Sequence, residues 1–387
     1  MGDPTRLRDR CAIAGIGLSR FGKVPGVSAM GFCLEASKRA IDDCGVARDD
    51  IDGVLVMMPA QMGEAHGWGS RVAAFLGITP RFCATMDMGG ATPIGMLQTA
   101  VMAIEAGFAD VVLCTFGTQT NPQGVFPMLF GSQWAIPYGD VGAITFMGHV
   151  ARRQMHEHGI TSLDYAHVAV QWRQHANKNP AAQMGHKTMT VEDHQTSRLV
   201  NEPLRLFDCC LFTDGGGAFI VTSAARARDL KQTPALVAGV GQVHSAELIR
   251  PWDDGRGGGI EAGTQAYRMA GCGPGDISVV QIYDAFTPRV MHDLVAYGFA
   301  DWDEVGSLAA GGELTVGGRL PCNTAGGLLS EGHLSGMNHV AEAVRQVRGT
   351  STTQVPNVAL SMVTGFGGAP HEPPPTVAYT CAILRKP

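Results

Sequence analysis

The chain has 387 residues, of which 45% are hydrophobic and 17% charged, so it has enough apolar material for a large core and is neither disordered nor a coiled coil. Its net charge of −6 excludes the basic footprint of a nucleic-acid-binding protein. At about 100–200 residues per domain, this length predicts two or three domains or one duplicated unit. The 51 glycines predict many short elements joined by tight turns.

The cysteines and the N-terminus indicate the compartment. The 10 cysteines contain no C-x-x-C pair and no regular spacing, which excludes a zinc ribbon or a disulfide framework in this chain. The charged N-terminus runs directly into a strand-like segment, so no signal peptide is expected. No apolar run reaches the ~18 residues of a membrane span. We therefore expect a soluble, cytoplasmic protein whose partners include neither a membrane nor nucleic acid.

The first part of the chain alternates apolar strands with amphipathic helices. In chain order, the predicted elements are a strand at 11–17, a helix at 30–44, a strand within 49–57, a helix over 89–107 that opens with Gly89 and Gly90, and a strand at 109–117. Residues 118–200 interrupt this order with aromatic residues, histidines and two helical pieces, at 142–158 and 162–177. They predict an inserted loop or cap domain. Pro203 begins the return to a strand at 218–223.

The same order of elements returns in the second part, which predicts an internal duplication. Its predicted segments are 235–241, 259–271, 275–283, 331–349, 355–365 and 376–384. Near-continuous apolar strands that alternate with helices predict a parallel-dominated sheet covered on both faces. We expect an α/β fold in which two βαβαβ halves form a five-layer α/β/α/β/α body. The N-terminal half would comprise 1–117 and 201–230, the cap 118–200 and the C-terminal half 231–387.

Two glycine-marked helix starts locate the predicted site. Ligands of such sheets bind at the carboxyl ends of the strands, where helices begin with unsatisfied amides. Gly89–Gly90 and Gly332–His333 occupy matching places in the two repeats. A pseudo-twofold relation between the halves would bring both starts into one central pocket.

Several ordered segments resemble the thiolase superfamily, specifically its sterol-carrier-protein-X branch with its lipid-transfer and steroid side-chain aldolase relatives. They are AIAGIGLSRFGK, DDIDGVLV, SRLVNEPLRLFDCCLFTDGGGAFIVTS, QIYDAFT, GGLLSEGHLSGMNH and GFGGA. The resemblance covers nearly the whole chain and implies the thiolase fold with its duplicated halves.

The sequence departs from this family where the thiolases hold their nucleophile. The family places a cysteine at the opening of the first-repeat helix, where helix amides lower its pKa. The matching stretch is DMGGATPIGM, so Gly90, or its neighbour Gly89, stands in that place. The second family cysteine, or the histidine that replaces it in this branch, would fall in 361–364, which reads SMVT. We expect Cys83, the nearest upstream thiol, to be a core cysteine.

The Gly-His motif is retained at His333, and Tyr283–Asp284 stand where the branch has His-Asp. Relatives that lack the cysteine and carry this tyrosine resemble retro-aldolases, which cleave a β-hydroxyacyl-CoA into a carbonyl compound and a shorter acyl-CoA. The resemblance therefore implies an acyl-CoA carbon–carbon lyase that acts on a bulky steroid or aromatic side chain. Steroid aldolases often carry a second tyrosine where this chain keeps His333.

A retro-aldol reaction needs a base for the β-hydroxyl and a group that holds the thioester enolate, but no nucleophile. We assign Tyr283 to the hydroxyl side, with Asp284 as an orienting carboxylate. We assign His333 to polarising the thioester oxygen or protonating the enolate. An equally good interpretation makes Tyr283 a strand cap, and Asp284 is more often a structural carboxylate that binds loop amides.

Glycines are expected to bind the substrate, because they let the backbone approach a thioester closely. These are Gly89, Gly90, Gly332 and Gly367, with backbone amides near Gly90 or Gly367 as donors to the thioester oxygen.

Coenzyme A is expected as part of the substrate, and no other cofactor and no metal are expected in this chain. Candidates to meet its phosphates are Arg152, Arg153, Arg173 and Lys178. The resemblance implies a homodimer. It also implies an obligate small partner with a zinc ribbon and an oligonucleotide-binding-type (OB-fold) barrel, giving a heterotetramer in which any zinc belongs to the partner.

Two other functions stay open. One is a thiolase, an acetyl-CoA acyltransferase that uses a displaced cysteine such as Cys83. The other is a non-catalytic lipid-transfer or acyl-CoA-binding protein, for which the missing cysteines are equally good support.

Overall fold

The computed structural model describes residues 3–59, 66–119, 136–139, 142–245, 257–369 and 376–387. Within these ranges, nine strands form one sheet in the order β3-β2-β4-β7-β1-β8-β11-β10-β9. The first half supplies β1 (Cys11–Leu18), β2 (Gly53–Met57), β3 (Phe82–Met86), β4 (Val111–Thr118) and β7 (Gly215–Ser223). The second half supplies β8 (Ala235–Ser245), β9 (Val279–Gln281), β10 (Leu360–Ala369) and β11 (Thr376–Arg385).

The pairing confirms the duplication but not the predicted parallel character. Strands β1, β2, β4 and β7 match β8, β9, β10 and β11 in order. Of the strand pairs in this sheet, three are parallel and five antiparallel. The expectation of a parallel-dominated sheet is therefore wrong. In each half the last strand, β7 or β11, lies antiparallel to both of its neighbours.

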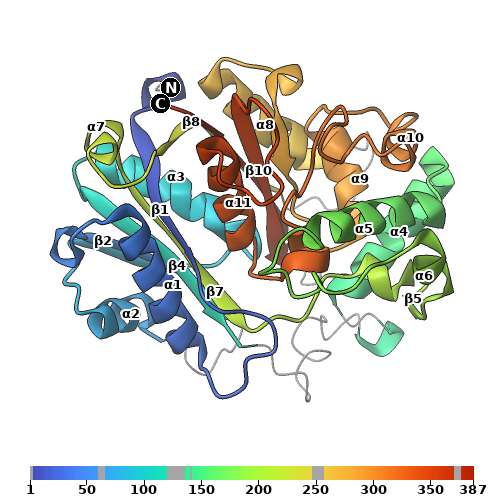
Figure 1. Ribbon diagram of the computed structural model, residues 1–387, viewed down its shortest axis with the longest axis horizontal. Coiled ribbons are helices and arrows are strands. Elements are labelled where there is room, and N and C mark those ends of the chain that lie inside the picture. Colours follow the sequence, from blue (N-terminus) through green and yellow to red (C-terminus); the bar gives the residue numbers. More distant parts are fainter. Residues whose placement is uncertain (1–2, 60–65, 120–135, 140–141, 246–256, 370–375) are drawn as a thin grey trace.

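The helices complete five layers (Figure 1). Helices α1 (Ala29–Cys44) and α2 (Trp68–Leu76) cover the outer face of the first half, and α8 (Gly257–Ala270) and α9 (Thr287–Ala296) cover the second. Helices α3 (Thr92–Glu105) and α11 (Met337–Arg348) lie between the two half-sheets, because α3 contacts both β4 and β10 and α11 contacts both β1 and β10. The predicted α/β/α/β/α order is confirmed.

The repeated AGIG and AGVG segments explain why the halves fold alike. A Cβ atom on Gly17 would lie 2.3 Å from the carbonyl oxygen of Ala36 in α1. One on Gly241 would lie 1.9 Å from the carbonyl oxygen of Ala262 in α8. In each repeat, therefore, the glycines of the first strand let the covering helix lie directly on the backbone of the sheet.

The two halves meet along a short seam. Strands β1 and β8 are joined by only two register pairs, Ala12↔Leu236 and Ile13↔Ala235. Most of the contact between the halves is made instead by α3 and α11, whose buried side chains form one cluster with both half-sheets. The chain termini lie side by side (Figure 1), where Arg385 and Asp9 form an ion pair.

The inserted segment packs beside the second half. It contains α4 (Ala143–His158), α5 (Ser162–Ala176), α6 (Val191–Thr196) and the small sheet of β5 (Leu199–Asn201) and β6 (Leu204–Arg205). Both predicted helical pieces are confirmed. Helices α4 and α5 contact α9, and α5 also contacts α10 (Val305–Ala310). The short helix α7 (Ala224–Arg228) follows β7. None of the described helices is both long and apolar enough to cross a membrane.

The central helices begin later than their glycines predicted. Helix α3 starts at Thr92, and α11 starts at Met337 after a single π-helical turn at 327–331. The predicted helix start at Gly332–His333 is therefore wrong, and His333 lies in the turn that joins the two helical segments. Gly336 takes φ +88° immediately before α11, a backbone conformation that favours glycine and sets the true start.

Candidate active site

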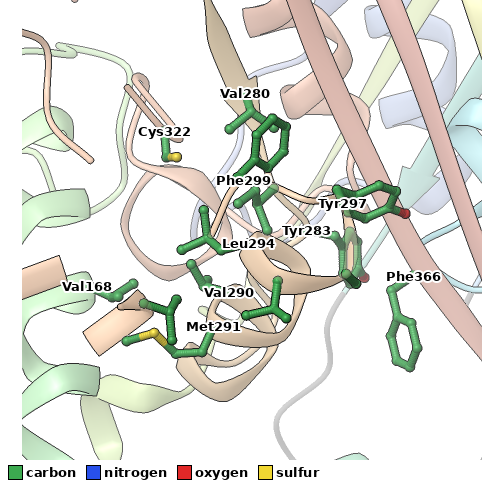
Figure 2. Packing of buried hydrophobic residues seen from close by; sticks show 14 of the residues in the cluster. Val168, Val280, Tyr283, Val290, Met291, Leu294, Tyr297, Phe299, Cys322 and Phe366 are labelled. Atoms are coloured by element: carbon green, nitrogen blue, oxygen red, sulfur yellow. The ribbon is translucent and has the colours of Figure 1, made fainter. Parts of the chain in front are cut away.

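Tyr283 occupies the space that a side chain at position 90 would need. Tyr283 follows β9, whereas Gly90 lies in the turn before α3. A Cβ atom on Gly90 would lie 2.0 Å from Cζ of Tyr283 and 2.1 Å from its hydroxyl oxygen. The ring is 6% exposed and belongs to the buried cluster of the second half, together with Tyr297 and Phe366 (Figure 2). This arrangement leaves no room for a cysteine at position 90.

The Tyr283 hydroxyl meets the imidazole of His333. Its Oη lies 3.3 Å from Nε2 of His333, and the two rings meet edge to face. The backbone nitrogen of Tyr283 donates to Oγ1 of Thr364 at 3.0 Å, which fixes the start of the turn after β9. The backbone nitrogen of His333 donates to Oγ1 of Thr213 at 2.8 Å. The structure thus brings together Gly90, Tyr283 and His333 from three distant segments.

Burial sets the protonation states of this pair. Removal from water raises the pKa of Tyr283 above its usual value of 10, and the nearby Cys210 and Asp284 raise it further. Removal from water lowers the pKa of His333 to about 4, although Asp284 opposes this shift. At neutral pH the phenol is therefore protonated and the imidazole is neutral. The two groups can exchange a proton without either starting as an ion.

Asp284 holds the turn at 327–331 rather than the Tyr283 hydroxyl. Its carboxylate accepts hydrogen bonds from the backbone nitrogens of Leu328 at 2.9 Å and Leu329 at 3.2 Å. Nε2 of His339 lies 3.0 Å from Oδ1 of the same carboxylate. Gly327 permits this contact, because a Cβ atom there would lie 2.2 Å from Oδ2 of Asp284. These contacts match the structural role considered for Asp284, that of a carboxylate that binds loop amides.

Three of the four predicted glycines converge. Gly89 takes φ +56°, and a Cβ atom on it would lie 3.1 Å from Cα of Gly367. A Cβ atom on Gly367 would lie 1.9 Å from the carbonyl oxygen of Met88 and 2.8 Å from the nitrogen of Gly90. The fourth, Gly332, lies elsewhere, against the ring of Phe21. Bare backbone from β10 therefore lies directly on the turn before α3.

Comparison with known proteins places this arrangement in a family. The family model "Thiolase C-terminal domain-like" matches residues 252–374. A "Steroid side-chain-cleaving aldolase" of Thermomonospora curvata is 38% identical, over 94% of this chain and 97% of the relative. A "17-hydroxy-3-oxo-4-pregnene-20-carboxyl-CoA lyase" of Mycobacterium tuberculosis is 37% identical, over 94% of this chain and 98% of the relative. The chain belongs to the thiolase superfamily, in the branch that contains the steroid side-chain-cleaving aldolases.

A solved structure agrees with this assignment. The "Ltp2-ChsH2(DUF35) aldolase" superposes with a TM-score of 0.88 at 38% identity, over 98% of each chain. The thiolase-like fold and the predicted branch are therefore confirmed.

The displaced-cysteine alternative loses its candidate in this thiolase-like fold. Cys83 lies on β3, and its sulfur lies 3.2 Å from where a Cβ atom on Gly69 of α2 would be. Since α2 belongs to the outer layer, this thiol faces away from the central helices and from Tyr283. Cys83 is exposed in this chain, so the expectation of a core cysteine is wrong. Partial removal of the thiol from water still raises the pKa of Cys83 above 9, which reduces its thiolate fraction.

A different thiol reaches the site, and sequence reasoning missed it. Sγ of Cys210 lies 3.9 Å from Nδ1 of His333, on the opposite side of the imidazole from Tyr283. Burial and the neighbouring Asp284 raise the pKa of Cys210 to about 12, so the thiol is protonated at neutral pH. In the sequence, the segment LFDCC indicates only a return to the sheet. Its position 123 residues before His333 carries no local signal of this contact.

Most of the basic residues expected to bind the CoA phosphates already interact with other side chains of this protein. Arg173 is 3% exposed, and its Nε donates to Oγ of Ser330 at 3.0 Å. Arg152 pairs with Glu202, and Arg153 pairs with Glu157. The expectation is therefore wrong for Arg173, which is buried. Among the described residues, no three His, Cys, Asp or Glu side chains cluster as a metal ion would require.

Proposed function

We propose that this chain is an acyl-CoA carbon–carbon lyase that cleaves a bulky β-hydroxyacyl-CoA, with a steroid or aromatic side chain, into a ketone or aldehyde and a shorter acyl-CoA. One observation carries the proposal. Tyr283 fills the space that a side chain at position 90 would need, and its hydroxyl lies 3.3 Å from Nε2 of His333. This site has no nucleophile between the two residues but has a pair that can move a proton. The relative from Mycobacterium tuberculosis, a CoA lyase by name, supports the same chemistry.

The proton would travel from substrate to His333 through Tyr283. As the β-hydroxyl of the substrate gives its proton to Oη of Tyr283, the phenol passes its own proton to Nε2 of His333. The bond between the α and β carbons then breaks, the β carbon becomes a carbonyl, and the electron pair remains on the thioester enolate. His333 returns the proton to the α carbon, so the enzyme ends as it began.

The pKa values suit a relay better than a stable ion pair. Because burial lowers the pKa of His333 to about 4, the imidazolium is unstable and readily gives up its proton to the enolate. Because the pKa of Tyr283 is raised, a free phenolate is avoided, and the phenol exchanges one proton for another.

The backbone around Gly90 would bind the enolate oxygen. Gly367 is required here, because any side chain at 367 would press on the Met88 carbonyl and lie close to the Gly90 nitrogen. We propose that Gly89, Gly90 and Gly367 line the thioester group and that backbone amides near Gly90 or Gly367 donate to its oxygen. Gly332 would act only by setting the turn that carries His333.

A homodimer is part of the proposal. Strand β3 lies at the edge of the sheet, and its five residues are only partly covered in one chain. Such an edge invites pairing with another strand. In β3 the nitrogen of Phe82 donates to Asp52 and the carbonyl of Met86 accepts from Met58, both on the β2 side, so the N–H of Cys83 faces the open edge. Replacing Cys83 with proline should therefore block that pairing. Sedimentation should then give a dimer for the wild type and a monomer for Cys83→Pro.

A small partner protein is also proposed, because the name of the similar solved aldolase joins two proteins, Ltp2 and ChsH2(DUF35). The partner of this chain would carry the zinc ribbon and the OB-fold barrel, and two of each chain would form a heterotetramer. Zinc analysis tests this. The metal should copurify with the complex but not with this chain alone.

A cytoplasmic location accords with the ten free thiols.

Turnover by the purified complex tests the lyase proposal directly. Incubation with a panel of bulky β-hydroxyacyl-CoA esters should release the carbonyl compound and the shorter acyl-CoA in equal amounts. Tight binding of the panel without cleavage would support the lipid-transfer alternative instead.

A further inference from the structure

The imidazole of His333 has a defined neighbour at each ring nitrogen. Among the described residues, the hydrogen-bond contacts of the ring are Oη of Tyr283, 3.3 Å from Nε2, and Sγ of Cys210, 3.9 Å from Nδ1. A neutral imidazole carries one proton, so one nitrogen donates and the other accepts. Which nitrogen holds the proton decides whether the ring can act as a base toward Tyr283.

The segment that carries Cys210 is fixed to the same turn as His333. The backbone nitrogen of Cys210 donates to the carbonyl of Ala285 at 2.9 Å, and that of Leu211 donates to the carbonyl of Leu328 at 3.0 Å. Three residues after Cys210, Thr213 accepts the backbone N–H of His333. One short segment therefore holds both the backbone and the ring of His333, and the sulfur has little freedom to move away.

The relative strength of the donors selects one tautomer. A phenolic O–H is a strong donor, whereas a thiol S–H is a weak one. Leaving the buried Tyr283 hydroxyl without an acceptor therefore costs more free energy than leaving the Cys210 thiol without one. The favoured arrangement has Tyr283 donating to Nε2 and Nδ1–H pointing at the sulfur.

We infer that Cys210 is a positioning residue: while Tyr283 donates to Nε2 of His333, the sulfur accepts Nδ1–H, and both contacts together keep the proton on Nδ1 so that Nε2 can accept the proton passed through Tyr283. The sulfur acts on proton transfer through the imidazole, since its side-chain hydrogen-bond contact is with Nδ1 of His333. This role rests on the proposed lyase function for its effect on turnover, but the tautomer itself does not.

Nitrogen NMR of the full-length protein with ¹⁵N-labelled histidine reads the tautomer directly, with His333→Gln as the variant that assigns the signal. The wild type should show a protonated Nδ1 and an unprotonated Nε2, the opposite of the tautomer that free histidine favours. Cys210→Ala should shift the signals toward a mixture, because the acceptor is gone. The matched control is Cys209→Ala, which removes the adjacent thiol. That thiol contacts the Arg205 carbonyl rather than His333.

Turnover provides the second measurement. Cys210→Ala should lower kcat about five- to tenfold, the range of one neutral hydrogen bond, with KM unchanged. Cys210→Ser, whose hydroxyl also accepts, should restore most of the rate, and Cys209→Ala should leave it intact. A proton on Nε2 in the wild type, or the same tautomer in wild type and Cys210→Ala, would overturn the inference. A correct tautomer in a protein that cleaves no β-hydroxyacyl-CoA would instead count against the proposed function.

Discussion

The two central helices occupy matching places in the repeats, yet the chain ahead of them is built differently. Ahead of α3, Thr92 closes a tight turn. Its hydroxyl accepts from the nitrogen of Met88 at 2.8 Å and donates to the carbonyl of Gly89 at 2.6 Å, so the turn presents main chain. Ahead of α11, the π-helical turn leads into a longer segment that presents His333. Duplication thus supplies the same framework twice, while the chemistry depends on how the halves differ.

The inserted segment supports the second turn. The nitrogen of Gln183 donates to the carbonyl of Glu331 at 2.8 Å, and Nδ2 of Asn179 donates to the carboxylate of Glu331 at 3.2 Å. Arg173 adds the bond to Ser330 described above. The first half has no such insertion against α3 in the described residues. The insertion therefore stabilises the turn that positions the imidazole.

The largest effect on turnover is expected from adding a side chain at Gly90, which removes the difference between the two turns. Gly90→Ala places a Cβ atom within about 2 Å of the Tyr283 ring, which must move. We expect turnover to fall about 10²–10⁴-fold, as for loss of a proton-transfer group, and the free energy of unfolding to fall about 1–3 kcal/mol. Gly275→Ala is the control, because a Cβ atom there meets nothing. Steady-state kinetics that match the wild type would remove the basis of the site.

Removing only the phenol oxygen keeps the halves packed and isolates the chemistry. Tyr283→Phe should lower kcat about 10²-fold or more, while the free energy of unfolding changes by only about 1 kcal/mol. Tyr267→Phe is the matched control, since it removes a hydroxyl that donates to the Tyr297 carbonyl in the same half. If both variants turn over equally well, the Tyr283 hydroxyl transfers no proton.

The pH dependence of stability separates His333 from other buried histidines. Its pKa of about 4 lies below the 6.5 of the unfolded chain, so the unfolded state takes up a proton first as the pH falls. The stability contribution is complete above pH 6.5 and is lost toward pH 4, by at most about 1.4 kcal/mol per pH unit. His333→Gln should flatten the measured slope of unfolding free energy against pH.

His175 is the comparison for this measurement, because burial lowers its pKa to about 4 as well. His175→Gln should flatten the slope to a similar degree without the loss of turnover seen in His333→Gln. Glu331, whose pKa is raised to about 7, adds a slope of opposite sign to all three proteins and cancels in the differences. Equal slopes in wild type and His333→Gln would contradict the neutral, buried imidazole.

The smallest effect is expected at Cys83, on the outer side of the first half. Cys83→Ser should change kcat less than about twofold, since its sulfur contacts α2 and not the centre. Mass spectrometry after treatment with acyl-CoA should find no acylated cysteine peptide in the wild type. An acyl group on Cys83 would restore the thiolase alternative.

The sequence predicted those parts of the fold that repeat or follow a period. The AGIG and AGVG segments marked the first strand of each half, and the apolar spacing located α1 and the two helices of the insertion. Strand direction was not predictable in this way, because an apolar run reads the same whether its neighbour is parallel or antiparallel. The start of α11 was missed because it depends on the positive φ of Gly336, which the sequence permits but does not require.

The site was predictable at positions where this chain departs from the residue that thiolases carry. Gly90 and Tyr283 each marked a departure from the thiolase pattern, and the structure puts them in contact. Cys210 and His339 were missed, since their partners lie far away in sequence and neither residue breaks a local pattern. For Asp284 the sequence already favoured a structural carboxylate that binds loop amides. It did not identify those amides, which are those of Leu328 and Leu329 in a turn that no periodicity shows.

The fit of the Tyr283 ring into the gap at Gly90 has a consequence for assembly. The ring comes from one repeat and the gap from the other, so neither repeat alone contains a working centre. A nascent or partly docked chain therefore has no catalytic activity until the two halves pack against each other. Enzymatic turnover can therefore serve as a sensitive assay of complete folding, more specific than any measure of helix content.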